Sequence, residues 1–261
     1  MTDNYLFSPI ASTDGLRKIK LIREKMRITK HIFRITLALI VASVCMSAST
    51  QKKLVIRKVD FDQIKKETLD PHSRYYYPRL LKTFFNETDT SMTIDAFRHL
   101  YYGYVFQEDY NPFRESEFSS IVEQLYYKPK LTRAECDSIE KYAELSLNDN
   151  IFDLDQMKYF IHGLNQRQKY NRARMRQFRL DRLVATIMSS GKGTKEEPWV
   201  VIAPGHEYNM VNFLGYVATE HQELGNGIDY IKVQKKEGKS TEGFYFDVSM
   251  MMKVAEQKFP E

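Results

Sequence analysis

Apolar side chains recur every three or four positions through most of residues 52–190, which is the spacing that one face of an α-helix requires. We predict seven helices in this stretch. Several should begin at short polar side chains that can accept a bond from a free backbone N–H. These candidate N-caps are Asp60, Thr93, Thr132 and Asp153. Glu135 completes a capping box with Thr132, because its carboxylate can reach back to the backbone of the cap.

Proline and glycine indicate other helix boundaries. Pro78 lies where the second helix is expected to begin, since proline fits the first turn of a helix. Pro112 interrupts the third helix, and a fourth is expected from about Arg114 to Tyr127. The seventh helix is long and should end at Gly191, because glycine readily takes the left-handed conformation of a C-terminal cap.

Two of the predicted helices share a pattern. Thr93–Tyr104 aligns without gaps on Asp153–Leu164, with large apolar residues at matching positions. Both segments carry glycine at the same place, Gly103 and Gly163, where a missing side chain lets a neighbouring helix approach closely. Helix pairs that bury their faces against neighbouring pairs repeat in this way, and the pattern resembles degenerate tetratricopeptide repeats.

The most aromatic stretch of the chain is "RHLYYGYVFQEDYNPF", from Arg98 to Phe113. Tyr101 falls on the main apolar face of the third helix, so we expect it in the core. Tyr101→Ala should therefore lower the free energy of unfolding by about 3 kcal/mol. Tyr110 and Phe113 follow the helix and are candidates for an exposed partner-binding surface, where Tyr110→Ala would cost little.

The pattern changes after the helical body. Residues 191–197 are small and polar and predict a linker. Four segments rich in β-forming residues follow, separated by glycine, asparagine or lysine: "WVVIA", "GYVATEHQEL", "IDYIKVQ" and "GFYFDVS". We predict that residues 198–252 form a small antiparallel β-meander packed on the helices, since so small a sheet has little core of its own. "HEYNMVNFL" should supply one or two helical turns. The predicted fold class is α+β.

Positive charge is concentrated at the start of the chain. Residues 1–48 hold eight Lys and Arg against three acids, which accounts for the whole formal charge of +5. The rest of the chain is formally neutral, so we expect no nucleic-acid partner.

This basic leader has the order of an export signal. From Met26, the basic "MRITKHIFR" precedes the apolar "ITLALIVASVCM" and the small residues of "CMSAS". We assign residues 26–48 to a signal peptide and residues 1–25 to an extension upstream of the native start. The apolar run is shorter than the roughly 20 residues of a transmembrane helix, so no span is expected in the mature chain. The product should be periplasmic, envelope-associated or secreted.

The two cysteines leave one alternative open. Cys45 could carry a lipid anchor, although the preceding "ASV" departs from the usual lipoprotein pattern. Cleavage after residue 47 leaves Cys136 alone, so no intrachain disulfide is available.

Arginines at helical spacing suggest one binding surface. Arg172, Arg176 and Arg179 share a helix face within "RQKYNRARMRQFRLDR". A row of guanidinium groups can bind an acidic protein or the phosphates of a lipid. The alternative is a solvated face paired with acids on neighbouring helices.

Histidine and acidic residues near the predicted strands are the candidates for chemistry. His206, Glu207, His221 and Glu223, with Asp229, could supply a metal-dependent or hydrolytic site. No His-Glu-x-x-His or paired-cysteine spacing accompanies them, and adjacent residues on a strand point to opposite faces. "GKGT" lacks the strand-to-helix setting of a phosphate loop. We therefore expect no metal and no other cofactor.

Several segments together resemble a known family. The segments are the leader, "YYYPRLL", "HLYYGYVFQEDYNPF", "SSGKGTKEEPWVVI", "HEYNMVNFLGY" and "IDYIKV" followed by "EGFYFDV". Over residues 52–252 the chain is similar to an uncharacterised domain-of-unknown-function family of exported proteins from Gram-negative gut anaerobes. The resemblance implies an exported bacterial protein with a tetratricopeptide-like helical part, and it brings no catalytic residues.

The leading functional interpretation is a non-enzymatic scaffold that binds a protein or peptide of the cell envelope. The first alternative is the metal-dependent or hydrolytic enzyme described above. The second is glycan recognition through exposed tyrosines and Trp199, since aromatic rings combine an apolar face with a polar edge.

Overall fold

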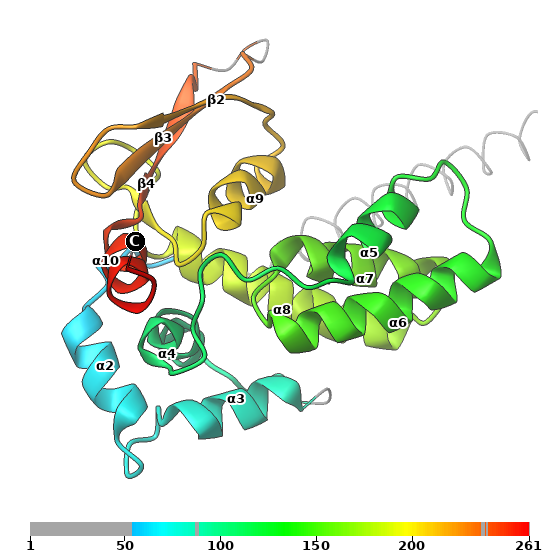
Figure 1. The fold of residues 1–261 in the computed structure, drawn as a ribbon, viewed down its shortest axis with the longest axis horizontal. Coiled ribbons are helices and arrows are strands. Elements are labelled where there is room, and N and C mark those ends of the chain that lie inside the picture. The colour runs from blue at the N-terminus through cyan, green and yellow to red at the C-terminus, as the bar shows by residue number, and fades with distance from the viewer. Residues whose placement is uncertain (1–53, 87–88, 236–237, 239, 261) are drawn as a thin grey trace, which may run out of the picture. The chain divides into compact units, whose positions relative to one another are not determined.

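The computed structural model describes residues 54–86, 89–235, 238 and 240–260. The predicted upstream extension, the signal peptide over residues 26–48 and Cys45 lie outside these residues. Seven of the described α-helices precede the first strand, and the α+β class is confirmed (Figure 1). No helix among the described residues is long and apolar enough to cross a membrane.

Nine α-helices, a 3-10 helix and four strands form the described part of the chain. The helices of the N-terminal body are α2 (Phe61–Leu69), α3 (Tyr77–Phe85), α4 (Ile94–Gly103) with the 3-10 turn η1 (Tyr104–Phe106), α5 (Ser119–Tyr126), α6 (Arg133–Asp149), α7 (Leu154–Gln166) and α8 (Tyr170–Met188). All four predicted N-caps accept a bond from a backbone N–H in the first turn of their helix, and the capping box is complete.

Three predicted helix boundaries are wrong. The third helix was expected to continue to Pro112, but α4 ends at Gly103 and the 3-10 turn η1 at Phe106. α5 begins at Ser119 rather than near Arg114, because side chains of Asn111 and Ser116 bond to backbone N–H groups two residues on and hold turns there. α8 ends at Met188, and Gly191 does not take the left-handed conformation. A Cβ added at Gly191 would lie 2.2 Å from the carbonyl oxygen of Pro198, so this glycine permits a close approach of backbone instead.

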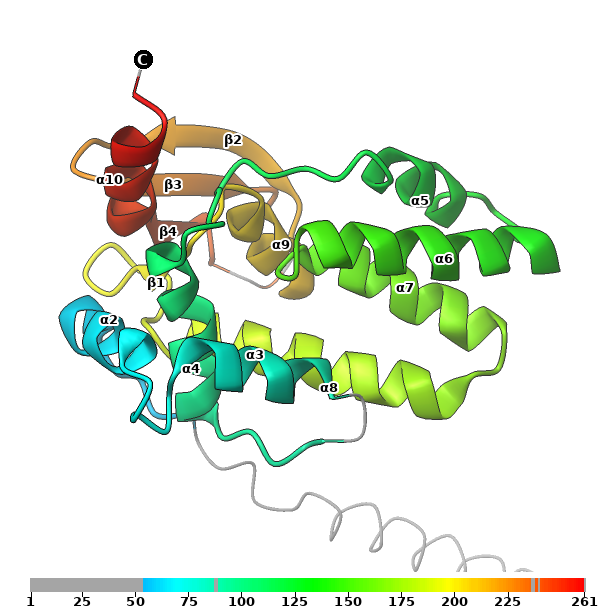
Figure 2. The same ribbon diagram turned by 60° about the horizontal axis from the view of Figure 1, so that its bottom comes forward.

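The glycines of the two similar helices allow close packing, as predicted. A Cβ at Gly103 would lie 2.6 Å from Cγ2 of Thr68 on α2, and one at Gly163 would lie 2.7 Å from Cγ2 of Ile139 on α6. α4 and α7 also pack against the long helix α8, which runs back from the α7 turn to the sheet (Figure 2). α8 therefore connects the group α2–α4, through α4, with the group α5–α7, through α7.

The sheet is mixed rather than an antiparallel meander. Its strands are β1 (Trp199–Val200), β2 (Ala218–Glu223), β3 (Ile228–Val233) and β4 (Gly243–Asp247), in the order β1-β4-β3-β2. β2, β3 and β4 are antiparallel, as predicted, whereas β1 pairs parallel with β4. The reason is the connection after β1, which carries the chain through α9 (Gly205–Phe213) and places β2 at the far edge.

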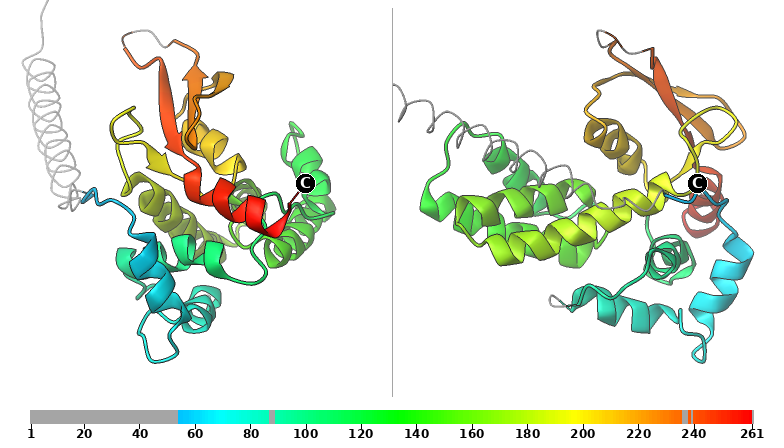
Figure 3. Two further views of the ribbon diagram at one scale, coloured as in Figure 1. Left: turned by 60° about the vertical axis from the view of Figure 1, so that its left-hand side comes forward. Right: turned by 180° about the vertical axis from the view of Figure 1, so that it is seen from behind.

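A further helix follows the last strand. α10 (Ser249–Lys258) follows β4 and packs against η1 (Figure 3). The ammonium group of Lys258 donates to the carbonyl oxygens of Gln107, Glu108 and Tyr110 at 2.7, 2.9 and 3.2 Å. This contact fastens the loop that follows η1 to the last helix, within the one compact unit that Leu54–Glu261 form.

The aromatic stretch forms core over more of its length than predicted. Tyr101 is fully buried, as expected. Tyr110 was expected at the surface and is instead buried, with its hydroxyl donating to the carbonyl oxygen of Ile202 at 2.7 Å. Its ring also packs edge-on against Tyr104 at 5.2 Å between centroids. Phe113 is 62% exposed, so only this residue of the pair is available at the surface.

The structure reverses the expected effect of one substitution. Tyr110→Ala should lower the free energy of unfolding by about 3 kcal/mol, because it removes a buried ring and leaves a buried carbonyl without its donor. Phe113→Ala, at an exposed position three residues later, is the control and should change it by less than about 0.5 kcal/mol. Urea unfolding measures both, and equal small effects would contradict the buried position of Tyr110.

Candidate functional site

α9 lies between the helical body and the sheet and has functional side chains on two faces. His206 and Asn209, three positions apart, share the face that lines a large groove. Glu207 points instead towards the sheet, where it meets His221. One short helix therefore contributes to two candidate sites.

His206 is a fully satisfied core residue. Its Nε2 lies 2.9 Å from the carbonyl oxygen of Phe152, which can only accept, so Nε2 carries the proton. Nδ1 then accepts from the hydroxyl of Tyr101 at 2.6 Å. Burial lowers the pKa of His206 to about 4 and keeps the ring neutral, although the Phe152 carbonyl and Asp155 act in the opposite direction. Both ring nitrogens are engaged, so the grouping of His206 with Glu207, His221 and Glu223 is wrong for this residue.

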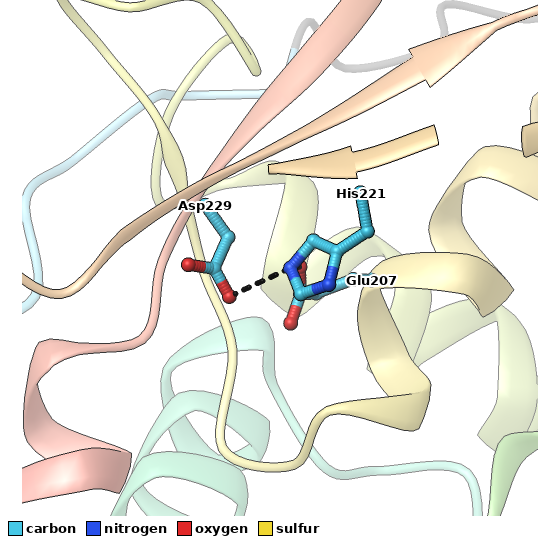
Figure 4. Close-up of side chains that lie close together, drawn as sticks. All are labelled: Glu207, His221 and Asp229. Carbon is cyan, nitrogen blue, oxygen red and sulfur yellow. Dashed lines mark ion pairs between the residues drawn. The ribbon is translucent and has the colours of Figure 1, made fainter. Parts of the chain in front are cut away.

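Glu207, His221 and Asp229 do converge, from α9, β2 and β3 (Figure 4). Nε2 of His221 lies 3.2 Å from Oδ2 of Asp229 and 3.9 Å from Oε2 of Glu207. One ligand atom of each residue lies within 4.8 Å of the others. We name these three residues the carboxylate–histidine cluster.

Strand alternation explains which residues of the sheet take part. Asp229 lies opposite Glu223, and His221 is two residues from Glu223, so these three side chains share the sheet face. Glu220 points to the other face, where it pairs with Lys232. Glu223 is exposed and stays outside the three-residue group, yet its charge reaches Glu207.

Glu207 is the most perturbed acid of the cluster. Its side chain is 2% exposed, and Oε2 accepts no hydrogen bond from any residue in the described part of the chain. Burial, followed by the charges of Asp229 and Glu223, raises the pKa of Glu207 to about 8. A cation placed among the three ligand atoms would stabilise the ionised carboxylate, so these residues could hold a metal ion.

The other face of α9 borders a groove of about 590 Å³. Its walls come from residues 112–123, from the start of α7 and from the start of α9. Five carboxylates face it, against a single arginine, Arg114. The five are Glu115, Glu117, Glu123, Asp153 and Asp155. We name this feature the acidic groove, and sequence reasoning missed it.

Two of these acids are held in place at the base of α7. Asp153, the N-cap, accepts from the backbone N–H of Gln156, while burial, followed by the charge of Asp155, raises its pKa to about 6. Asp155 accepts from the side chains of Lys158 at 2.5 Å and Asn209 at 2.7 Å. The groove wall is thus positioned by α7 and α9 together.

Comparison with models of protein families identifies the family of this chain. A family model described as Domain of unknown function (DUF4919) matches residues 62–257. The protein belongs to the DUF4919 family. No curated protein and no solved structure matches this chain.

In this DUF4919 protein the predicted arginine row is not an exposed surface. Arg179 is buried, with its guanidinium over an aromatic ring. Arg172 and Arg176 pair with acids on α6, Glu140 and Glu144. These pairs match the alternative considered from the sequence, in which acids on a neighbouring helix balance the charges of the arginines.

Two further side chains singled out in the sequence, Trp199 and Cys136, are buried, whereas tyrosines such as Tyr127 and Tyr170 are exposed. Trp199 is 4% exposed and its indole N–H donates to the carbonyl oxygen of Gly191, so it offers no stacking face to a glycan. A Cβ added at Gly193, whose φ is 69°, would lie 2.7 Å from the ring of Trp199, so only glycine fits at this position. Cys136 is a buried free thiol within α6, as the sequence indicated.

The neighbours His206 and Glu207 should give opposite dependences of stability on pH. The protonated form of Glu207 stabilises the fold fully below pH 4.5, and this contribution is lost as the pH rises through about 8. The neutral form of His206 stabilises the fold fully above pH 6.5, and this contribution is lost as the pH falls through about 4. Between pH 4.5 and 6.5 the two slopes offset one another.

Single substitutions should reveal each slope. Relative to the wild type over this interval, Glu207→Gln should make the free energy of unfolding rise with pH, and His206→Gln should make it fall. Each change is expected to approach about 1.4 kcal/mol per pH unit. Urea unfolding at a series of pH values, with EDTA to keep the cluster free of metal, measures this. Slopes of the same sign in both variants would contradict the assignment.

Proposed function

We propose that this protein is an exported, non-enzymatic scaffold and that its acidic groove binds a Lys- and Arg-rich segment of a partner protein in the cell envelope. The observation that carries the proposal is the charge of the groove. Glu115, Glu117 and Glu123 are exposed around it, and none has an ion-pair partner within the described ranges. The chain after residue 48 is formally neutral, so this local excess of acids is not a property of the whole surface.

Groups on the groove floor support a ligand with N–H donors. Gln156 is 3% exposed, and its Oε1 accepts no hydrogen bond from a described residue, while its Nε2 donates to the carbonyl oxygen of Ser119. An unsatisfied buried acceptor costs free energy, and a donor in the groove would recover it once a movement of the Gln156 side chain exposes Oε1. The volume of about 590 Å³ also lies in the range of ligand-binding clefts.

A peptide segment fits this lining better than a small polyamine. The walls mix carboxylates with hydroxyl and amide groups, among them Ser119, Asn150 and Asn209, which can bond to a peptide backbone. Phe113 adds an exposed ring at the rim. The export part of the proposal rests on the order of basic, apolar and small residues in residues 26–48.

Neutralising the exposed acids tests the proposal. Fluorescence anisotropy with a short labelled peptide of alternating Lys or Arg and small residues should show binding that weakens as salt is added. The triple variant Glu115→Gln, Glu117→Gln, Glu123→Gln should bind about tenfold more weakly, since three partly screened charge contacts together contribute about 1.5 kcal/mol.

A second triple variant controls for net charge. Glu196→Gln, Glu242→Gln and Glu256→Gln remove the same number of exposed acids away from the groove, and binding should be unchanged. Equal weakening in both variants, or equal binding of a Glu-containing counterpart of the peptide, would reject the groove as the binding surface. Competition by spermine at the same concentration as the peptide would assign the groove to polyamines instead and reject the peptide proposal.

A further inference from the structure

We propose that the carboxylate–histidine cluster binds one divalent transition-metal ion, with Zn²⁺ as the representative ion. Its ligands would be Nε2 of His221 and one carboxylate oxygen each from Glu207 and Asp229. The site is separate from the acidic groove, because Glu207 and the groove-facing His206 lie on different faces of α9.

The spacing of the ligand atoms fits a small tetrahedral ion. Ligands about 2.0–2.1 Å from zinc lie about 3.4 Å from one another around a tetrahedron. The distances from Nε2 of His221 are 3.2 Å to Asp229 and 3.9 Å to Glu207, and all three ligand atoms lie within 4.8 Å of one another, so the three side chains would draw together around the ion to complete the geometry. An imidazole nitrogen with carboxylate oxygens is a donor set that zinc accepts.

Glu207 points independently to a ligand. A buried carboxylate whose Oε2 accepts no hydrogen bond from a described residue is costly in either protonation state. The free oxygen is the one that faces His221, and Asp229 places a second carboxylate beside the same imidazole. A cation between them would compensate both acids and satisfy the orphaned oxygen.

The three ligands also differ in exposure in a way that suits a metal site. Glu207 and Asp229 have side chains 2% and 11% exposed, whereas His221 is 33% exposed. Solvent therefore reaches the cluster from the side of His221. Three protein ligands with an open side leave a fourth position for water, as in sites where zinc activates a bound water molecule.

Zinc titration of the EDTA-treated full chain tests the site. Isothermal titration calorimetry should show one Zn²⁺ per chain, and zinc should raise the melting temperature because it binds the folded state. His221→Gln and Asp229→Asn should each weaken binding at least tenfold and abolish the increase in melting temperature. Glu220→Gln, on the same strand but the opposite face, should bind zinc as the wild type does.

Each outcome either supports the metal site or overturns it. Circular dichroism first establishes that each variant is folded, and a zinc affinity that His221→Gln leaves unchanged would place the metal elsewhere and overturn the proposal. Absence of stoichiometric binding to the wild type would likewise overturn it and leave Glu207 as a buried neutral acid. Co²⁺ added in place of Zn²⁺ should give visible absorption bands in the wild type and not in His221→Gln.

Discussion

The hydrogen bonds of one neutral imidazole, that of His206, fix the position of α9 relative to α4 and to the turn before α7. His206 accepts from Tyr101 of α4 and donates to Phe152, in the turn before α7, while its own backbone belongs to α9. Only a neutral histidine supplies a donor and an acceptor at opposite ends of one ring, and burial keeps it neutral. The rotation of α9 follows from these bonds, and with it the direction of Glu207 towards the sheet and of Asn209 towards the groove. Both proposed sites therefore depend on how this one residue orients α9.

Local signals in the sequence predicted local structure well. The caps at Asp60, Thr93, Thr132 and Asp153 involve atoms within three residues of one another, and the pattern of short polar residues before apolar runs was enough to place them. Burial by distant segments was not predictable in this way. Tyr110 is covered because Ile202 and Lys258 come to it from far along the chain. Likewise, the parallel position of β1 depends on where α9 carries the chain.

In the candidate sites too, local features were predictable from the sequence and contacts between distant segments were not. The alternation of β2 would have been sufficient to place His221 and Glu223 on one face, and a short turn to β3 adds Asp229 opposite Glu223. Choosing Glu207 over its neighbour His206 required the rotation of α9, which tertiary hydrogen bonds determine. The acidic groove combines residues before and after α6, so the sequence alone does not show that Glu115, Glu117 and Glu123 lie near Asp153 and Asp155.

The pairing of β1 with β4 has a consequence for the order in which the chain folds. Contacts of α6 with α7 and of α7 with α8 join neighbours in sequence, whereas Val200 pairs with Asp247 across a segment that holds α9, β2 and β3. Loop-closure entropy favours the early formation of the helices and the late addition of β1. Until then Trp199 lacks the rings of Phe244 and Phe246, which cover it in the finished sheet. A sheet that forms before β1 joins it leaves this aromatic surface uncovered, and transiently exposed apolar surface of this kind favours aggregation.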